Sequence, residues 1–149
     1  MFRIFIQKIF PINDGINDRQ PLSGTHWSLL IYTRNENTFY YYDSMGAGGI
    51  EWIARKSLNG LQAIVQAPSI PSFKVLNILR QENGYDCGGY VIRITYLLAQ
   101  RLEDRGYDLA HPDPNMWDIN DSQIRPKEIA LYRQYLFMDI IKRAVKYTK

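Results

Sequence analysis

Residues 26–44 read HWSLLIYTRNENTFYYYDS, and this stretch decides the fold. An almost continuously apolar run over residues 26–33 is typical of a strand that is buried on both faces. A polar turn follows, and residues 39–42 predict the return strand. We therefore expect two antiparallel strands, with His26 at the start of the first and Asp43 at the end of the second.

The segments on either side of this hairpin predict further strands and a helix. Residues 2–12 nearly alternate between apolar and polar side chains, as a half-buried strand does. A long polar loop then leads to Gly24. Beyond the hairpin, glycines break the sheet, apolar residues recur at helical spacing over residues 50–65, and residues 73–76 indicate another short strand.

The second half of the chain is predicted to be helical. A helix should start at or just after Cys87, because one apolar stripe follows at helical spacing: Tyr90, Val91, Ile94, Leu97, Leu98 and Leu102. Residues 106–123 predict an irregular crossing, and Pro126 is well placed to open a last helix that runs to about Lys146. This order of elements predicts an α+β domain.

The length and the cysteine count narrow the class of protein. A chain of 149 residues is expected to form one domain, residues 1–149, around a single core. Cys87 is the only cysteine, which excludes a disulfide-rich secreted scaffold. No secretory leader is recognisable, and no apolar run approaches the roughly 20 residues of a membrane-spanning helix. We expect an intracellular protein of the cytoplasm or nucleus without a membrane partner.

The charge pattern argues against a nucleic-acid partner. Eighteen basic and 15 acidic residues give a net charge of +3, and the basic residues are spread along the chain. Their densest group, Lys142, Arg143, Lys146 and Lys149, is better explained by a solvated helix face. One cysteine and two histidines in unrelated segments do not match a zinc site, so we expect no metal. The aromatic content of 13% indicates a well-packed core.

Cys87 lies where a cysteine can act as a nucleophile. The N–H groups and the dipole at a helix N-terminus favour the thiolate over the thiol. Gly88 and Gly89 follow directly and would let a substrate approach closely. The alternative is a small buried residue at the start of a core helix, and Cys87 alone favours that alternative.

Three further residues could complete a thiol site. His26 could act as a base for the thiol, while Asp43 could accept from its second nitrogen and fix the tautomer. Gln81 offers a neutral amide donor for the oxyanion of a tetrahedral intermediate. The alternatives are a histidine bonded to a backbone carbonyl, an aspartate that caps a turn and an exposed loop glutamine. Only the combination with Cys87 favours catalysis.

The combination resembles a known family. The motifs GTHWSL at 24–29, YYDS at 41–44 and QENGYDCG at 81–88 resemble those of the Ulp/SENP family of ubiquitin-like-protein-specific cysteine proteases, including the order His, Asp, Gln, Cys. PIND at 11–14 and the surroundings of the histidine and the cysteine are more similar to the deneddylase branch than to the SUMO-specific branch.

This resemblance implies a papain-like fold, with an antiparallel-rich sheet flanked by helices, and a role for each residue. His26 would be the base, Asp43 its orienting group, Gln81 the oxyanion donor and Cys87 the nucleophile, with no cofactor. Family members cut after the C-terminal diglycine of a ubiquitin-like modifier, which would be the partner of a monomeric enzyme. Trp27 is similar to the tryptophan that presses on the diglycine tail, and Gly88 would also contact the substrate. A buried strand tryptophan is the alternative for Trp27.

The sequence also departs from the family pattern. Family members carry a segment before the histidine strand, including a second tryptophan that lines the substrate tunnel, whereas only 25 residues precede His26. The resemblance runs from about Phe5 to the final helix, so we expect an N-terminally truncated form of the domain. Deneddylation and precursor maturation are the leading hypothesis. A SUMO-directed protease, or a weakly active or inactive module that only binds a modifier, remain the alternatives.

Overall fold

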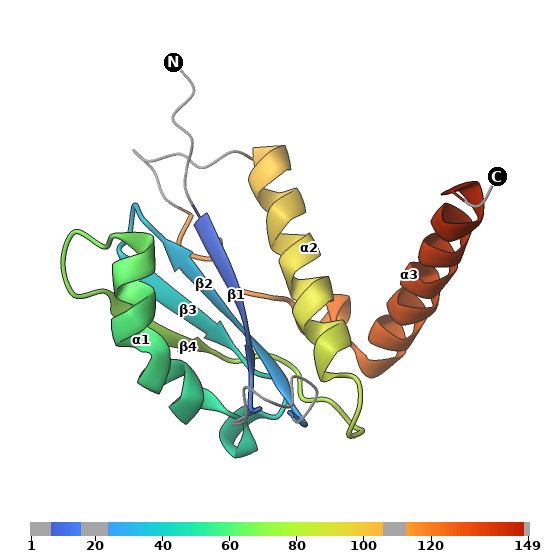
Figure 1. The fold of residues 1–149 in the computed structure, drawn as a ribbon, viewed down its shortest axis with the longest axis horizontal. Coiled ribbons are helices and arrows are strands. Elements are labelled where there is room, and N and C mark those ends of the chain that lie inside the picture. Colours follow the sequence, from blue (N-terminus) through green and yellow to red (C-terminus); the bar gives the residue numbers. More distant parts are fainter. Residues whose placement is uncertain (1–6, 16–23, 106–112, 148–149) are drawn as a thin grey trace.

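The computed structural model describes residues 7–15, 24–105 and 113–147. The predicted start of the first strand, part of the polar loop and the start of the irregular crossing lie outside these ranges. The elements follow in the predicted order (Figure 1): β1 Gln7–Asn13, β2 Trp27–Thr33, β3 Thr38–Tyr42, the 3-10 turn η1 Gly46–Gly48, α1 Glu51–Val65, β4 Ser72–Leu76, α2 Cys87–Arg105, the 3-10 turn η2 Asp121–Gln123 and α3 Pro126–Tyr147. The predicted α+β class is confirmed.

The strands form one mixed sheet in the order β1-β2-β3-β4. β2 pairs antiparallel with both β1 and β3, and Leu29 lies opposite Tyr42 in the hairpin. β4 pairs parallel with β3, because α1 carries the chain back across the sheet before β4 begins. The sheet is therefore antiparallel-rich, as expected, with one parallel pair at the β4 edge.

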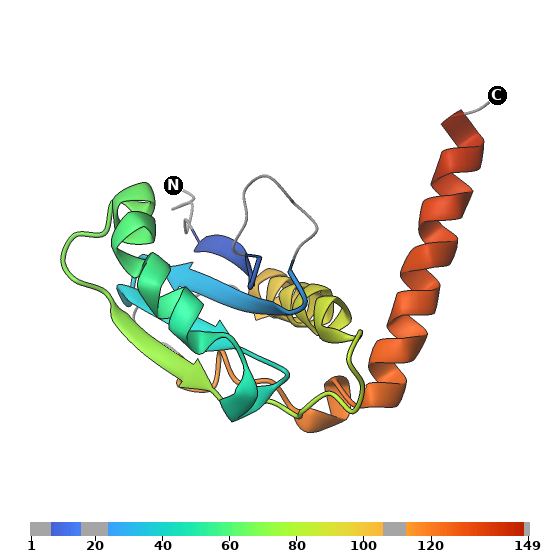
Figure 2. The same ribbon diagram turned by 60° about the horizontal axis from the view of Figure 1, so that its bottom comes forward.

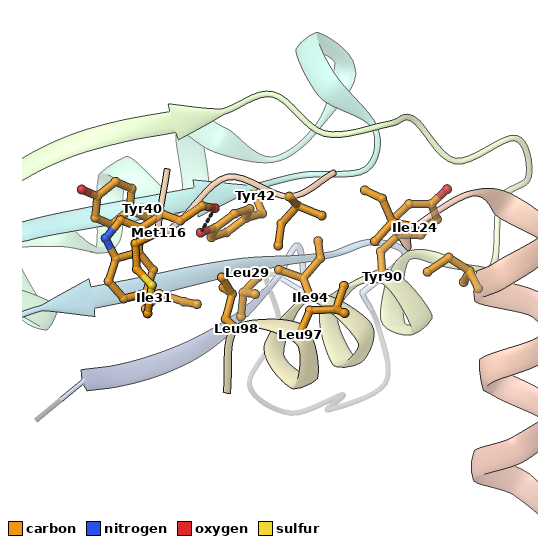
Figure 3. Packing of buried hydrophobic residues seen from close by; sticks show 13 residues of the cluster. Leu29, Ile31, Tyr40, Tyr42, Tyr90, Ile94, Leu97, Leu98, Met116 and Ile124 are labelled. Atoms are coloured by element: carbon orange, nitrogen blue, oxygen red, sulfur yellow. Dashed lines mark hydrogen bonds between the residues drawn. The ribbon is translucent and has the colours of Figure 1, made fainter. Parts of the chain in front are cut away.

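Helices cover both faces of the sheet, which explains the continuous apolar run in the hairpin. Tyr40 and Tyr42 of β3 pack with Leu29 of β2 and with apolar residues of α2 in one cluster (Figure 3). Tyr41 points to the opposite face and belongs to a second cluster, which includes Ala54 of α1. Because successive side chains of a strand alternate between faces, a strand covered on both sides needs apolar residues at every position.

The last helix leaves the body of the domain (Figure 2). Its first turns pack on α2, where Ile129 is fully buried, whereas Tyr135, Phe137 and Ile140 further along are exposed. Within the described residues no helix is both long and apolar enough to cross a membrane.

The topology brings three chain positions to one end of the sheet. The start of β2, the end of β3 and the start of α2 all lie toward the lower end of the molecule in Figure 1. The backbone N–H of Gln81 donates to the carbonyl of Ser44, which ties the loop before α2 to the end of β3. The residues predicted to act together therefore approach one another from separate elements.

Candidate active site

His26 and Asp43 are in direct contact. Nε2 of His26 lies 2.7 Å from Oδ1 of Asp43, and both residues are buried. His26 directly precedes β2 and Asp43 directly follows β3, so the antiparallel pairing sets this contact. A carboxylate at Nε2 places the proton there and leaves Nδ1 as the basic nitrogen. The carboxylate, and not a backbone carbonyl, holds the His26 ring.

The carboxylate of Asp43 is saturated with hydrogen bonds. Oδ1 also accepts from the backbone N–H of Met45, and Oδ2 accepts from the Tyr41 hydroxyl and the backbone N–H of Ile50. Burial by itself raises the pKa of Asp43, but the hydrogen bonds from His26, Tyr41, Met45 and Ile50 outweigh it and hold the pKa below 3.8. Asp43 thus caps the following turn and also binds the histidine.

Tyr41 and Gly49 complete the surroundings of this carboxylate. Burial raises the pKa of the Tyr41 phenol far above its usual value, so the hydroxyl stays protonated and donates to Asp43. A Cβ at Gly49 would lie 1.9 Å from Oδ2 of Asp43. Any larger residue at Gly49 would therefore displace the carboxylate.

A second acidic residue holds the backbone of His26. Oδ1 of Asp14 accepts from the backbone N–H groups of Thr25 and His26 at 2.5 and 2.8 Å, and Oδ2 accepts from the Thr25 hydroxyl at 2.6 Å. Nδ2 of Asn13 donates to the carbonyl of His26. Both polar groups of the His26 backbone are thereby fixed from the end of β1. Gly24 allows this close approach, since a Cβ there would lie 1.8 Å from Oδ1 of Asn13.

Replacing Asp14 with alanine should loosen His26 and lower the free energy of unfolding by about 1 kcal/mol at neutral pH. Burial raises the pKa of Asp14, but hydrogen bonds from the Thr25 hydroxyl and from the backbone of His26 and Thr25 bring it below 3.8. A carboxylate with a lowered pKa stabilises the fold above its unfolded-state pKa, and this contribution is lost as the pH falls through the folded-state pKa.

Urea unfolding of the wild-type chain and of Asp14→Ala, each at neutral and at acidic pH, measures this contribution. The two proteins should differ at neutral pH and converge on acidification. Asp14→Asn keeps an acceptor for the backbone N–H groups and should lose less stability. An equal difference between the wild type and Asp14→Ala at both pH values would contradict the role of the charge.

Gln81 is not an exposed loop glutamine. It is half-buried, its Oε1 accepts from the Ser44 hydroxyl at 2.6 Å, and its Nε2 donates to the carbonyl of Asn83 at 2.6 Å. An amide nitrogen carries two protons, so one N–H of Gln81 is used, and within the part of the chain that the structure describes the other has no partner and could bind a ligand. His26, Gln81 and Asn83 line one pocket of about 520 Å³.

Cys87 begins α2, as predicted, and the residue is only 6% exposed. The residue belongs to neither apolar cluster of the core. Among the described residues, neither the Cys87 sulfur nor Nδ1 of His26 has a hydrogen-bond partner, so these two atoms are not bonded to each other. Cys87 does not line the pocket that His26 and Gln81 share. The structure joins His26 to Asp43 and brings Cys87 to the same end of the sheet without that third bond.

The neighbours of His26 and Cys87 differ in exposure. Trp27 is 43% exposed, which excludes the alternative of a buried strand tryptophan. A Cβ at Gly88 would meet nothing within 4 Å, so the backbone beside Cys87 faces open space. A Cβ at Gly89 would lie 2.8 Å from Ile129 of α3. Gly89 therefore serves helix packing, whereas Gly88 leaves room for a ligand.

Comparison with known proteins now identifies the family. The model of the Ulp1 protease family, C-terminal catalytic domain, matches residues 9–146. The chain belongs to this family. Its relatives in the Ulp1 protease family include NEDD8-specific protease 1 of Arabidopsis thaliana, 30% identical over 66% of this chain, and sentrin-specific protease 8 of Mus musculus, 39% identical over 61%.

A similar solved structure supports the fold assignment. The Xanthomonas campestris effector XopD bound to ubiquitin superposes on 87% of this chain with a TM-score of 0.58 and 29% identity. This chain covers 59% of that one, and only 43% and 40% of the Arabidopsis and mouse relatives. The Ulp1-family chain described here therefore spans about two fifths of the length of these curated relatives.

Several residues of the site have contacts that the sequence alone does not indicate. Asp14, Asn13 and Asn83 stand in the quoted motifs, but their contacts depend on tertiary structure. The register of β1 on β2 places Asn13 opposite Trp27, and this register brings Asp14 to the His26 backbone. Only the register, which no local pattern predicts, could have revealed the contact.

Proposed function

We propose that this chain is a cysteine isopeptidase that cleaves after the C-terminal diglycine of a ubiquitin-like modifier. The buried His26–Asp43 pair, beside a helix that starts with Cys87, carries the proposal. The names of its relatives, NEDD8-specific protease and sentrin-specific protease 8, support deneddylation and precursor maturation as the reaction.

The proposed reaction is acyl transfer. Nδ1 of His26 takes the thiol proton of Cys87, and the thiolate attacks the carbonyl carbon of the terminal glycine. The free N–H of Gln81 stabilises the oxyanion, and His26 then gives the proton to the leaving amine. Water hydrolyses the thioester and regenerates the thiol. Proton transfer requires the Cys87 sulfur and Nδ1 of His26 to come into contact. We propose that the free protein also forms this contact and that substrate binding tightens it, because catalytic contacts are often long in the free protein.

Two accessible residues beside the site, Trp27 and Gly88, would contact the substrate. The half-exposed ring of Trp27 lies next to His26 in the chain and would cover the glycine tail, while the open space at Gly88 would admit it. A side chain on the modifier's last residues would clash in such a narrow passage, so glycine is required there. The reaction also needs a free thiol, and we propose that the protein acts in the reducing cytoplasm or nucleus.

A binding module is the second candidate. The 6% exposure of Cys87 and the missing bond between its sulfur and His26 favour a chain that holds a modifier without cleaving it. Incubation with NEDD8, SUMO and ubiquitin that carry a C-terminal electrophile separates the two candidates. A covalent adduct at Cys87, strongest with NEDD8, is expected, and Cys87→Ala is the control. Binding without any adduct would support the module, and an adduct with SUMO alone would identify a SUMO-directed protease.

A further inference from the structure

An ion pair from the last helix holds the residue that precedes Cys87. Nη1 of Arg133 in α3 donates to Oδ1 of Asp86 at 2.5 Å. The Asp86 side chain is 4% exposed and that of Arg133 is 49% exposed. The Arg133 guanidinium also lies over the Tyr85 ring, 5.1 Å from its centroid. One cation from a distant helix thus contacts both residues immediately before α2.

Asp86 is also hydrogen-bonded to the loop that carries Gln81. Nδ2 of Asn83 donates to Oδ2 of Asp86, and Oδ1 of Asn83 accepts from the backbone N–H of Asp86. The carbonyl of Asn83 accepts from Gln81, whose Oε1 accepts from the Ser44 hydroxyl. These bonds form an unbroken chain from α3 to the residue that follows Asp43.

We propose that Arg133 is a positioning residue for the reaction proposed above, on which this inference rests. It acts through Asp86 and Asn83 and sets the place of the Gln81 amide relative to the Cys87 sulfur. A buried carboxylate that loses its cation is strongly unfavourable, so Asp86 would turn toward water and release Asn83. The released carboxylate would still precede Cys87 directly in the chain without its cation, and its negative charge would disfavour the thiolate.

A purely structural ion pair predicts a different outcome. If Arg133 only fixed α3 to the domain, its loss would lower stability and leave the turnover of the folded protein unchanged. The oxyanion forms only after attack, so a misplaced Gln81 should lower kcat and leave KM nearly unchanged. The split between kcat and KM therefore separates positioning from structural support.

The test compares Arg133→Met with Arg133→Lys and with Arg143→Met. Methionine keeps an apolar stem over Tyr85 and removes the charge, whereas lysine restores a cation. Arg143 is the matched control, because it lies on the same helix and, among the described residues, pairs with Asp139 alone, one turn away at the surface. The measurements are kcat and KM on a modifier amide, the rate of Cys87 alkylation by iodoacetamide at neutral pH, and thermal unfolding.

We expect Arg133→Met to lower kcat about tenfold, less than the roughly 10²- to 10³-fold loss on removal of an oxyanion donor, with KM changed less than about twofold. Alkylation should slow about threefold. Arg133→Lys should recover most of both rates, and Arg143→Met should change neither. If Arg133→Met does not fold, Asp86→Asn combined with Arg133→Met removes both charges; it should restore alkylation and leave kcat lowered.

If folded Arg133→Met keeps the wild-type kcat and alkylation rate, the positioning role is overturned. It is also overturned if the double variant keeps the wild-type kcat. Failure of the wild-type chain to react with any modifier would overturn the proposed function instead. The alkylation comparison needs no modifier, so it still decides whether Arg133 acts on the Cys87 thiol.

Discussion

Replacing His26 with alanine is expected to reduce turnover of a diglycine-tailed modifier by about 10²- to 10⁴-fold, the usual contribution of general acid–base catalysis. The free energy of unfolding should change much less. Asp43 would lose one hydrogen bond and keep those from Tyr41, Met45 and Ile50. The variant should therefore remain folded. It lacks the base, but the Asp43 carboxylate keeps most of its hydrogen bonds.

Turnover and urea unfolding of the same preparation check this separation. His111 is the only other histidine of the chain and has no assigned role, so His111→Ala serves as the matched control and should leave turnover unchanged. If His26→Ala kept more than a tenth of the wild-type rate, His26 would not be the base.

Asp43→Ala is expected to impair both activity and stability. The substitution removes a buried carboxylate that accepts hydrogen bonds from four groups: the His26 ring, the Tyr41 hydroxyl and two backbone N–H groups. Loss of one partner from such a buried charged group costs about 3 kcal/mol or more. The His26 ring would also lose its orientation and tautomer, and in a comparable triad such a loss lowers kcat by about 10⁴-fold.

A graded series separates these two effects. Tyr41→Phe removes only one donor and should cost about 1 kcal/mol, and Asp43→Asn should fall between Tyr41→Phe and Asp43→Ala. Since the pKa of Asp43 is held below 3.8, the stability lost in Asp43→Ala should be full above that pH and disappear as the wild type is acidified through its folded-state pKa. An Asp43→Ala protein as stable as the wild type at neutral pH would contradict the hydrogen-bond network.

The strands and helices could be predicted because local patterns determine them. The almost continuously apolar run over residues 26–33 indicated cover on both faces of that strand, and α1 and α2 provide it. Cys87 was correctly expected to open α2, since its apolar stripe begins directly afterwards. The parallel pairing of β4 was not predicted, because strand direction depends on where α1 returns the chain.

The candidate site was predictable in part for the same reason. A hairpin places the start of one strand beside the end of the next, so the contact of His26 with Asp43 followed once the turn was recognised. The hydrogen bond between Asp14 and the His26 backbone could not be predicted without the register of β1 on β2. The pair between Asp86 and Arg133 joins positions 47 residues apart, and no sequence spacing indicates it.

The proposed function requires the Cys87 thiol, the His26 ring and the Asp43 carboxylate to act as one unit. The most direct measurement is the rate of Cys87 alkylation by iodoacetamide from about pH 5 to about pH 9, in the wild type and in His26→Ala. A free cysteine has a pKa of about 8.5 and reacts slowly in mild acid. The wild type should react rapidly at mildly acidic pH, and His26→Ala should lose this advantage. Identical rate profiles in the two proteins would contradict the claim.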